Sequence, residues 1–215
     1  MLRTPASLSA VLSGTWAARP TPIPANGKLY FAIDVGANGT LLQSNGTRWR
    51  PFNGAPATLK ALGASVSGIT NSEQLVLQTL IPAGVIQTLD SLRFWLSLTK
   101  SGTTDGLTMT LRIGLAGTTA DPAVVNTALA MAASTITFGG IFDLKMLTST
   151  SAQRQGTGAA SGTHTYLGGT GTAQSGSIAI PDISANALYA SVGIASGGAT
   201  NTVGITSGAI QLVTP

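Results

Sequence analysis

The feature that most constrains this fold is a strict alternation of apolar and other side chains in the middle of the chain. Apolar residues recur at every second position in two runs, residues 92–98 and 107–115. Successive side chains of a β-strand point to opposite faces, so a period of two gives each run one apolar face. A turn-like segment rich in glycine and threonine, residues 101–106, separates the runs. We therefore predict a long hairpin with one buried face.

The rest of the second half also has the pattern of short strands separated by turn residues. Further strands are predicted at residues 73–81, 123–131, 134–147, 176–181, 187–195 and 202–213. Alanine-rich residues 124–137 could form a short helix, but their place between strands favours β-structure. About eight strands in one domain predict an all-β fold, a β-sandwich or jelly roll.

Three parts are predicted along the chain. Residues 1–26 are expected to be an extended attachment arm, because alternating prolines near its end exclude a helix. Residues 27–58 are expected to be a small β-hairpin module, with turns at Asn38-Gly39 and Asn45-Gly46. Residues 59–215 are the sandwich, with a long Gly/Ser/Thr loop at 149–176.

Charge and cysteine content exclude several classes of protein. Only 8% of the residues are charged and there is no cysteine, which removes disulfides and thiolate sites. Residues 1–60 hold six Lys or Arg and one acid, so residues 61–215 are almost neutral. A basic face for nucleic acid is not expected. No apolar run is long enough for a transmembrane helix, and the N-terminus is not expected to be a signal peptide.

Groups capable of catalysis are few and scattered. The single histidine, His164, lies in the predicted loop, where a catalytic triad would lack rigid support. The seven acids are spread over the chain, and most lie in turn-like settings. A hydrolase with two carboxylates that meet in space stays an alternative. We expect no enzyme activity, no cofactor and no metal site.

Candidate contact residues fall into two groups. His164 and Tyr166 are the bulky residues of the predicted loop and could touch a receptor. Trp95 and Arg93 lie opposite the leucine row, and the predicted hairpin could place Arg112 on the same face. An exposed tryptophan on a strand indicates an interface more often than a sugar site, although a carbohydrate platform stays open. Trp49 of the small module is a further candidate interface residue.

Two stretches are similar to tailed-bacteriophage fibre and other virion proteins. Residues 27–36 (GKLYFAIDVG) and 46–50 (GTRWR) resemble a short module of those proteins. Residues 81–84, 90–93, 100–103 and 112–121 are similar to β-sandwich domains of the same class. The matched stretches lie between residues 27 and 121, and they are structural and carry over no active-site residue.

The resemblance implies a non-enzymatic virion component, a tail fibre or baseplate-associated protein that assembles in the host cytoplasm. A head fibre, a capsid decoration protein and a receptor- or glycan-binding module are alternatives. Fibres of this family are commonly homotrimers. The arm would then contact other virion proteins, and a host surface glycan or protein could be a further partner.

Overall fold

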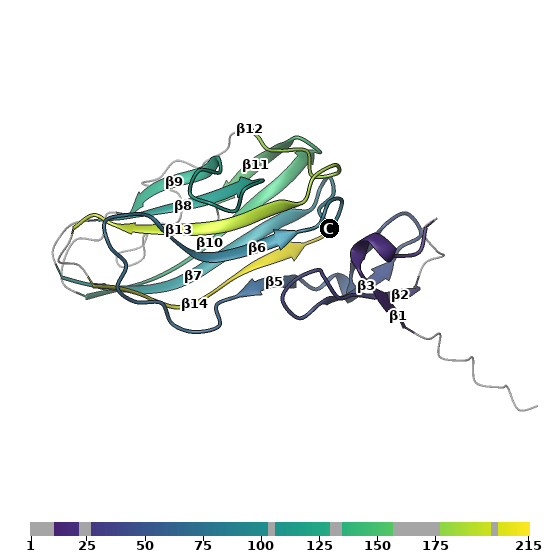
Figure 1. Cartoon of the computed structure of the whole chain (residues 1–215), viewed down its shortest axis with the longest axis horizontal. Helices are drawn as coiled ribbons and strands as arrows, with labels where there is room; N and C mark the ends of the chain where they lie inside the picture. The colour runs from purple at the N-terminus through teal and green to yellow at the C-terminus, as the bar shows by residue number, and fades with distance from the viewer. Residues whose placement is uncertain (1–10, 22–26, 103–105, 130–134, 157–176, 199–201) are drawn as a thin grey trace, which may run out of the picture.

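The computed structural model describes residues 11–21, 27–102, 106–129, 135–156, 177–198 and 202–215. Within these ranges the regular structure is β-strand apart from two short 3-10 turns, η1 (Trp16–Ala18) and η2 (Phe52–Gly54). The prediction of an all-β chain is confirmed (Figure 1).

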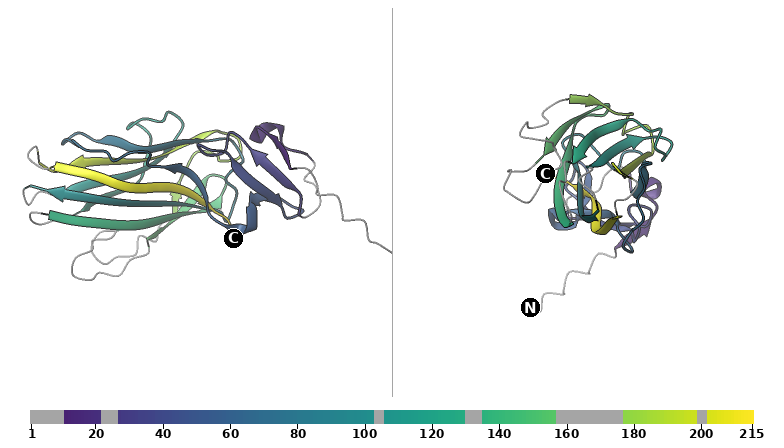
Figure 2. Two further views of the ribbon diagram at one scale, coloured as in Figure 1. Left: turned by 90° about the horizontal axis from the view of Figure 1, so that it is seen from below. Right: turned by 90° about the vertical axis from the view of Figure 1, so that its left-hand side faces the viewer.

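Residues from Ala57 onward form two packed sheets (Figures 1 and 2). The six-stranded sheet has the order β12-β11-β10-β7-β14-β5 and the four-stranded sheet the order β6-β13-β8-β9. The strands of the first are β5 (Ala57–Ala61), β7 (Ser91–Ser101), β10 (Thr135–Thr148), β11 (Ser151–Gly156), β12 (Ser177–Ala179) and β14 (Thr202–Val213). Those of the second are β6 (Gln74–Ile81), β8 (Leu107–Gly114), β9 (Ala123–Leu129) and β13 (Leu188–Ser196).

The strand order is that of a jelly roll. Four antiparallel pairs are nested in the sequence: β5 with β14, β6 with β13, β7 with β10, and β8 with β9. Successive pairs alternate between the two sheets, as in a hairpin that has been rolled around a barrel. β11 and β12 are an addition that widens the six-stranded sheet beside β10.

The predicted hairpin of residues 92–99 with 107–115 is wrong, although both segments are strands. β7 pairs with β10 and β14, whereas β8 pairs with β9 and β13 in the opposite sheet. The chain therefore crosses between the sheets after β7. Alternation tells which face of a strand is buried, but it does not tell which strand lies beside it.

The core lies between the two sheets. Inward side chains of β7 and β8 are at most 2% exposed, and they face similar rows from β13 and β14. The apolar inward residues of β7 and β8 are Leu92, Phe94, Leu96, Leu98, Leu107, Met109, Leu111 and Ile113. Each buried side chain of this kind contributes about 1.5–3 kcal/mol relative to exposure, so this interface accounts for most of the sandwich's stability.

The small module has four strands in the order β1-β2-β3-β4 and lies at one end of the sandwich (Figure 2). Its strands are β1 (Leu12–Gly14), β2 (Leu29–Ala32), β3 (Thr40–Ser44) and β4 (Trp49–Pro51). Gly39 and Gly46 have φ of 71° and 88°, as the two predicted turns require.

The expected arm at residues 1–26 differs from the structure in its second half. β1 pairs in parallel with β2, and Trp16 is buried at 3% exposure. Residues 11–18 therefore belong to the small module. A three-residue strand with two exposed side chains has too little pattern to be found from the sequence. Residues 1–10 and the prolines at 22 and 24 lie outside the described residues.

The predicted loop at residues 149–176 begins with regular structure, because β11 occupies Ser151–Gly156. The sequence did not predict β11, because Ala152 is the one apolar residue in this strand. The remainder, residues 157–176, lies outside the described residues, and so do His164 and Tyr166. The preference for a strand over a helix after residue 122 is confirmed by β9.

Candidate interaction surface

The candidate surface is the outer face of the six-stranded sheet around β7. Arg93 and Trp95 point away from the core, because the alternating burial of β7 places Phe94 and Leu96 inside. The register brings side chains of β10 and β14 beside them. We name this surface the Trp95 face, and its members are Arg93, Trp95, Ile141, Asp143, Ala209 and Gln211.

An apolar centre lies in the middle of the Trp95 face. Trp95 is half-buried and is paired with Ile141 on one side and Ala209 on the other. Ile141 is 44% exposed, whereas Ala209 is 2% exposed although it shares the outward orientation of Trp95. Paired residues of adjacent strands share a face, so the three side chains make one apolar strip across β10, β7 and β14.

An ion pair borders this apolar strip. The Arg93 guanidinium donates from Nε to Asp143 Oδ1 at 2.9 Å and from NH2 to Oδ2 at 2.8 Å. Hydrogen bonding to the Asp143 carboxylate raises the pKa of Arg93. A bidentate pair fixes the planes of both groups, so each side chain presents a defined polar edge beside Trp95.

Arg112 does not join this surface. It lies on β8 in the four-stranded sheet, where Nε and NH2 donate to Glu73 Oε1 and Oε2 at 2.9 and 2.6 Å. NH1 donates to the carbonyl oxygen of Asp121. Hydrogen bonding to Glu73 raises the pKa of Arg112. The expectation that Arg93 and Arg112 share a face is therefore wrong, because it depended on the incorrect hairpin.

Trp49 lies inside the small module. It is 4% exposed, and its ring centroid is 5.7 Å from that of Tyr30. The side chain therefore packs within its own chain, and its surface is not accessible to a second molecule.

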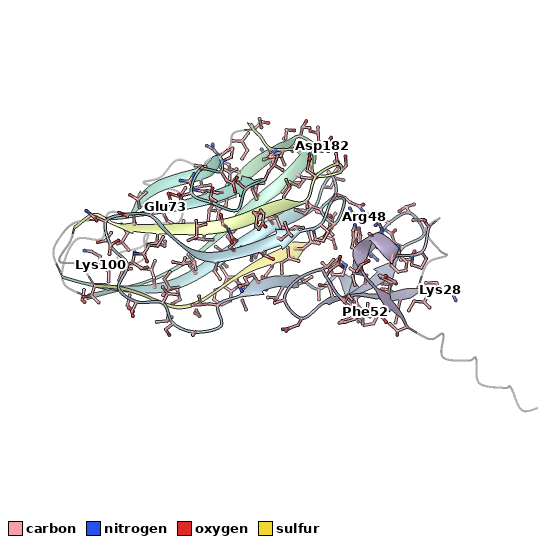
Figure 3. All side chains as sticks on the ribbon, viewed as in Figure 1. Lys28, Arg48, Phe52, Glu73, Lys100 and Asp182 are labelled. Atoms are coloured by element: carbon pink, nitrogen blue, oxygen red, sulfur yellow. The ribbon has the colours of Figure 1, made fainter. Side chains whose placement is uncertain are left out.

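The small module is held to the sandwich by polar contacts as well as by the chain itself. Trp16 Nε1 donates to the carbonyl oxygen of Ala83 at 2.9 Å, and Ala37 N donates to Leu59 O at 3.1 Å. Arg48 NH1 lies 3.0 Å from Asp90 Oδ1. Figure 3 labels Arg48 on the module. These contacts hold the module at one end of the sandwich.

Asp90 is the most perturbed acid of this junction. Its side chain is 3% exposed, and burial raises its pKa to about 6. The backbone N–H of Gln87, which donates to Oδ2 at 2.9 Å, and the charge of Arg48 act in the opposite direction. Sequence reasoning missed this pair, because residues 48 and 90 lie in separate modules with no shared pattern.

Each of the six acids that the structure describes has a structural partner. Glu73, Asp90 and Asp143 pair with arginines. The other three accept backbone N–H groups: Asp34 from Trp16, Asp121 from residues 116–118, and Asp182 from Ser184. In the described ranges no group of three or more His, Asp or Glu could hold a metal ion. Among the same residues, no helix has the length and apolar character to cross a bilayer.

Comparison with known proteins gives no family and only weak similarity to solved structures. No family model matches the chain, and no curated protein matches it. One similar solved chain belongs to infectious bursal disease virus, Gt strain, with 10% identity and a TM-score of 0.31, covering 84% of this chain and 41% of that chain. A chain of the Gx strain has 12% identity and a TM-score of 0.25, and the match covers 88% of this chain and 48% of that chain. This chain therefore spans less than half of either, and TM-scores this low carry no argument about function.

Proposed function

We propose that this protein is a non-enzymatic structural component of a bacteriophage virion, a tail fibre or baseplate-associated subunit that assembles in the host cytoplasm. The observation that carries the proposal is the structural engagement of every described carboxylate, beside the outward side chain of Trp95. The resemblance of short stretches between residues 27 and 121 to tailed-bacteriophage virion proteins supports a phage particle. A head fibre or capsid decoration protein has the same support.

The Trp95 face is proposed as the contact between copies in a homotrimer. The eleven-residue length of β7 across the three strands β10, β7 and β14 offers roughly 520 Å², at about 3.3 Å per residue and about 4.8 Å between strands. A standard interface buries about 800 Å² per partner. The apolar centre surrounded by polar side chains matches the anatomy of such interfaces.

Self-association is tested by light scattering on the full chain and two matched variants. Ile141→Lys places a charge in the apolar strip, whereas Leu80→Lys changes a side chain of similar exposure, 48%, on the other sheet. We expect trimers for the wild type and Leu80→Lys, and monomers for Ile141→Lys. An unchanged mass for Ile141→Lys would remove the Trp95 face from the interface.

The virion role needs a separate measurement, because a subunit can assemble only on its particle. We expect the intact protein in the mass spectrum of purified virions in a stoichiometric amount. Its presence in the infected-cell lysate and absence from the virions would refute the structural role.

A receptor- or glycan-binding module is the second candidate. The half-buried ring of Trp95 beside the fixed Arg93–Asp143 pair combines a stacking surface with hydrogen-bonding groups. Glycan-array binding that Trp95→Ala abolishes, while Leu80→Lys leaves it intact, would favour this function. Absence of any glycan signal with the wild type would argue against it.

A further inference from the structure

Four Asn-Gly pairs occur in the chain, and this dipeptide is chemically labile. Because glycine has no Cβ, its backbone nitrogen can reach the side-chain carbonyl carbon of the preceding asparagine. The asparagines of three pairs, Asn38, Asn45 and Asn53, lie among the described residues, whereas that of the fourth, at position 26, does not. The three described sites differ sharply in how their atoms are held.

Asn53 lies in the connection between the small module and the sandwich. Residues 52–56 are all exposed, and a Cβ at Gly54 would meet nothing within 4 Å. Asn53 has φ 57° and ψ 19°, a left-handed conformation that asparagine adopts more often than most non-glycine residues. The turn is closed by a backbone bond of 3.3 Å from Ala55 N to Phe52 O, which uses neither an atom of Asn53 nor the nitrogen of Gly54. This site has the space to rotate about its Cα–C bond.

Asn45 is held at both reacting groups. Its Oδ1 accepts from Thr47 N at 3.1 Å, from Thr47 Oγ1 at 2.9 Å and from Arg48 N at 2.8 Å. The nitrogen of Gly46 donates to Ser44 Oγ at 3.0 Å. These bonds have to break before the side chain and the nitrogen can meet.

Asn38 is held through the backbone of its two neighbours. Ala37 N donates to Leu59 O at 3.1 Å, and Gly39 N donates to Gly36 O at 3.3 Å. A Cβ at Gly39 would lie 2.6 Å from Phe31 Cζ, so the ring packs directly against this glycine. The turn therefore lacks the space that surrounds Gly54.

We propose that Asn53 is the preferred site of spontaneous deamidation among these three asparagines. The nitrogen of Gly54 attacks Cγ of Asn53, a new N–Cγ bond forms, and Nδ2 leaves as ammonia with a proton from the attacking nitrogen. Water then opens the resulting succinimide at either carbonyl and gives an aspartyl or an isoaspartyl residue. No oxidant, reductant or enzyme is required.

The product lies in the one covalent link between the small module and the sandwich. Either product replaces a neutral amide with a carboxylate, and the isoaspartyl form lengthens the backbone by one carbon. The Trp16–Ala83 and Arg48–Asp90 contacts are not part of this link, so the modified chain keeps them.

The test is site-resolved mass spectrometry of the full chain after storage in mildly alkaline buffer. Deamidation raises the mass of a peptide by the difference between water and ammonia, and the isoaspartyl form elutes separately. In the folded protein we expect Asn53 to react about tenfold faster than Asn45 or Asn38, because hydrogen bonds at those two sites must break first.

Two controls make the ranking decisive. In urea the three sites should react at similar rates, since the sequence pair is the same, and Asn53→Gln should remove the fast signal from the folded chain. Folded protein in which Asn45 or Asn38 reacts as fast as Asn53 would overturn the proposal. So would a folded Asn53 that stays intact while the unfolded chain reacts.

Discussion

Single residues of the sandwich are constrained by how closely their neighbours pack, and Gly208 of β14 is an example. A Cβ at this position would lie 2.5 Å from Leu96 Cδ2 and 2.9 Å from the carbonyl oxygen of Trp95. Gly204 in the same strand has its nearest neighbour, Thr99 Oγ1, at 3.4 Å. The same substitution by alanine is therefore expected to cost stability at Gly208 and to have little effect at Gly204, four residues away.

We expect Gly208→Ala to lower the free energy of unfolding by about 1–3 kcal/mol, because an added methyl group overpacks a closed core. Gly204→Ala should change it by less than about 0.5 kcal/mol, the usual range for changes that meet no such obstacle. Urea unfolding of both variants checks this pair. Equal midpoints would contradict the close approach at Gly208.

The candidate surface was partly predictable at the residue scale. The alternation of β7 places Arg93 and Trp95 opposite the leucine row, as the structure shows. Their neighbours Asp143 and Ile141 were not predictable, because β10 lies some 50 positions away and only the register brings them together. Burial of Trp49 was missed for the same reason: its packing partner Tyr30 lies on another strand.

At the scale of elements, the sequence predicts where strands lie far better than which strands pair. β7 and β8 are long and alternate strictly, so their positions agree with prediction. Their pairing was mistaken, since the antiparallel partners are supplied by distant parts of the chain. β1, β5 and β11 were missed, because short strands with few buried apolar residues show too little periodicity.

β1 makes the length of an N-terminal deletion critical. Removing residues 1–26 takes away β1 and the buried Trp16, including its bond to Ala83. Loss of a buried aromatic side chain alone costs about 3–5 kcal/mol, so we expect this deletion to lower the melting temperature markedly. Removing residues 1–10 leaves every described strand and should leave the melting temperature unchanged. Scanning calorimetry compares the two, and equal losses would show that β1 does not stabilise the module.

At the scale of the whole molecule, the junction between module and sandwich carries a pH dependence. The buried Asp90 has a pKa of about 6 in the folded chain against an ordinary value of 3.8. The folded state therefore takes up a proton at a higher pH than the unfolded chain. Lowering the pH from 7 towards 4 should stabilise the fold, and this gain is lost as the pH rises through about 6.

The expected gain from Asp90 is about 2 kcal/mol between pH 7 and 4, from the difference between the two pKa values. Asp90→Asn should flatten this part of the profile, measured by urea unfolding at several pH values. Asp143→Asn, which removes the carboxylate of a more exposed arginine pair, is the matched control and should keep the slope. If Asp90→Asn leaves the slope of the unfolding free energy against pH unchanged, the pH dependence arises from another group.

The nested pairing of the jelly roll sets the order in which the chain can become structured during synthesis. The first strand of the sandwich, β5, has its partner in β14, about 150 positions later in the sequence. The ribosome must therefore synthesise all the strands between them before the outermost pair can close. The small module needs only residues that emerge early, and contacts over short sequence distances form faster. During translation the small module can therefore form its strand pairs while the sandwich still lacks β14.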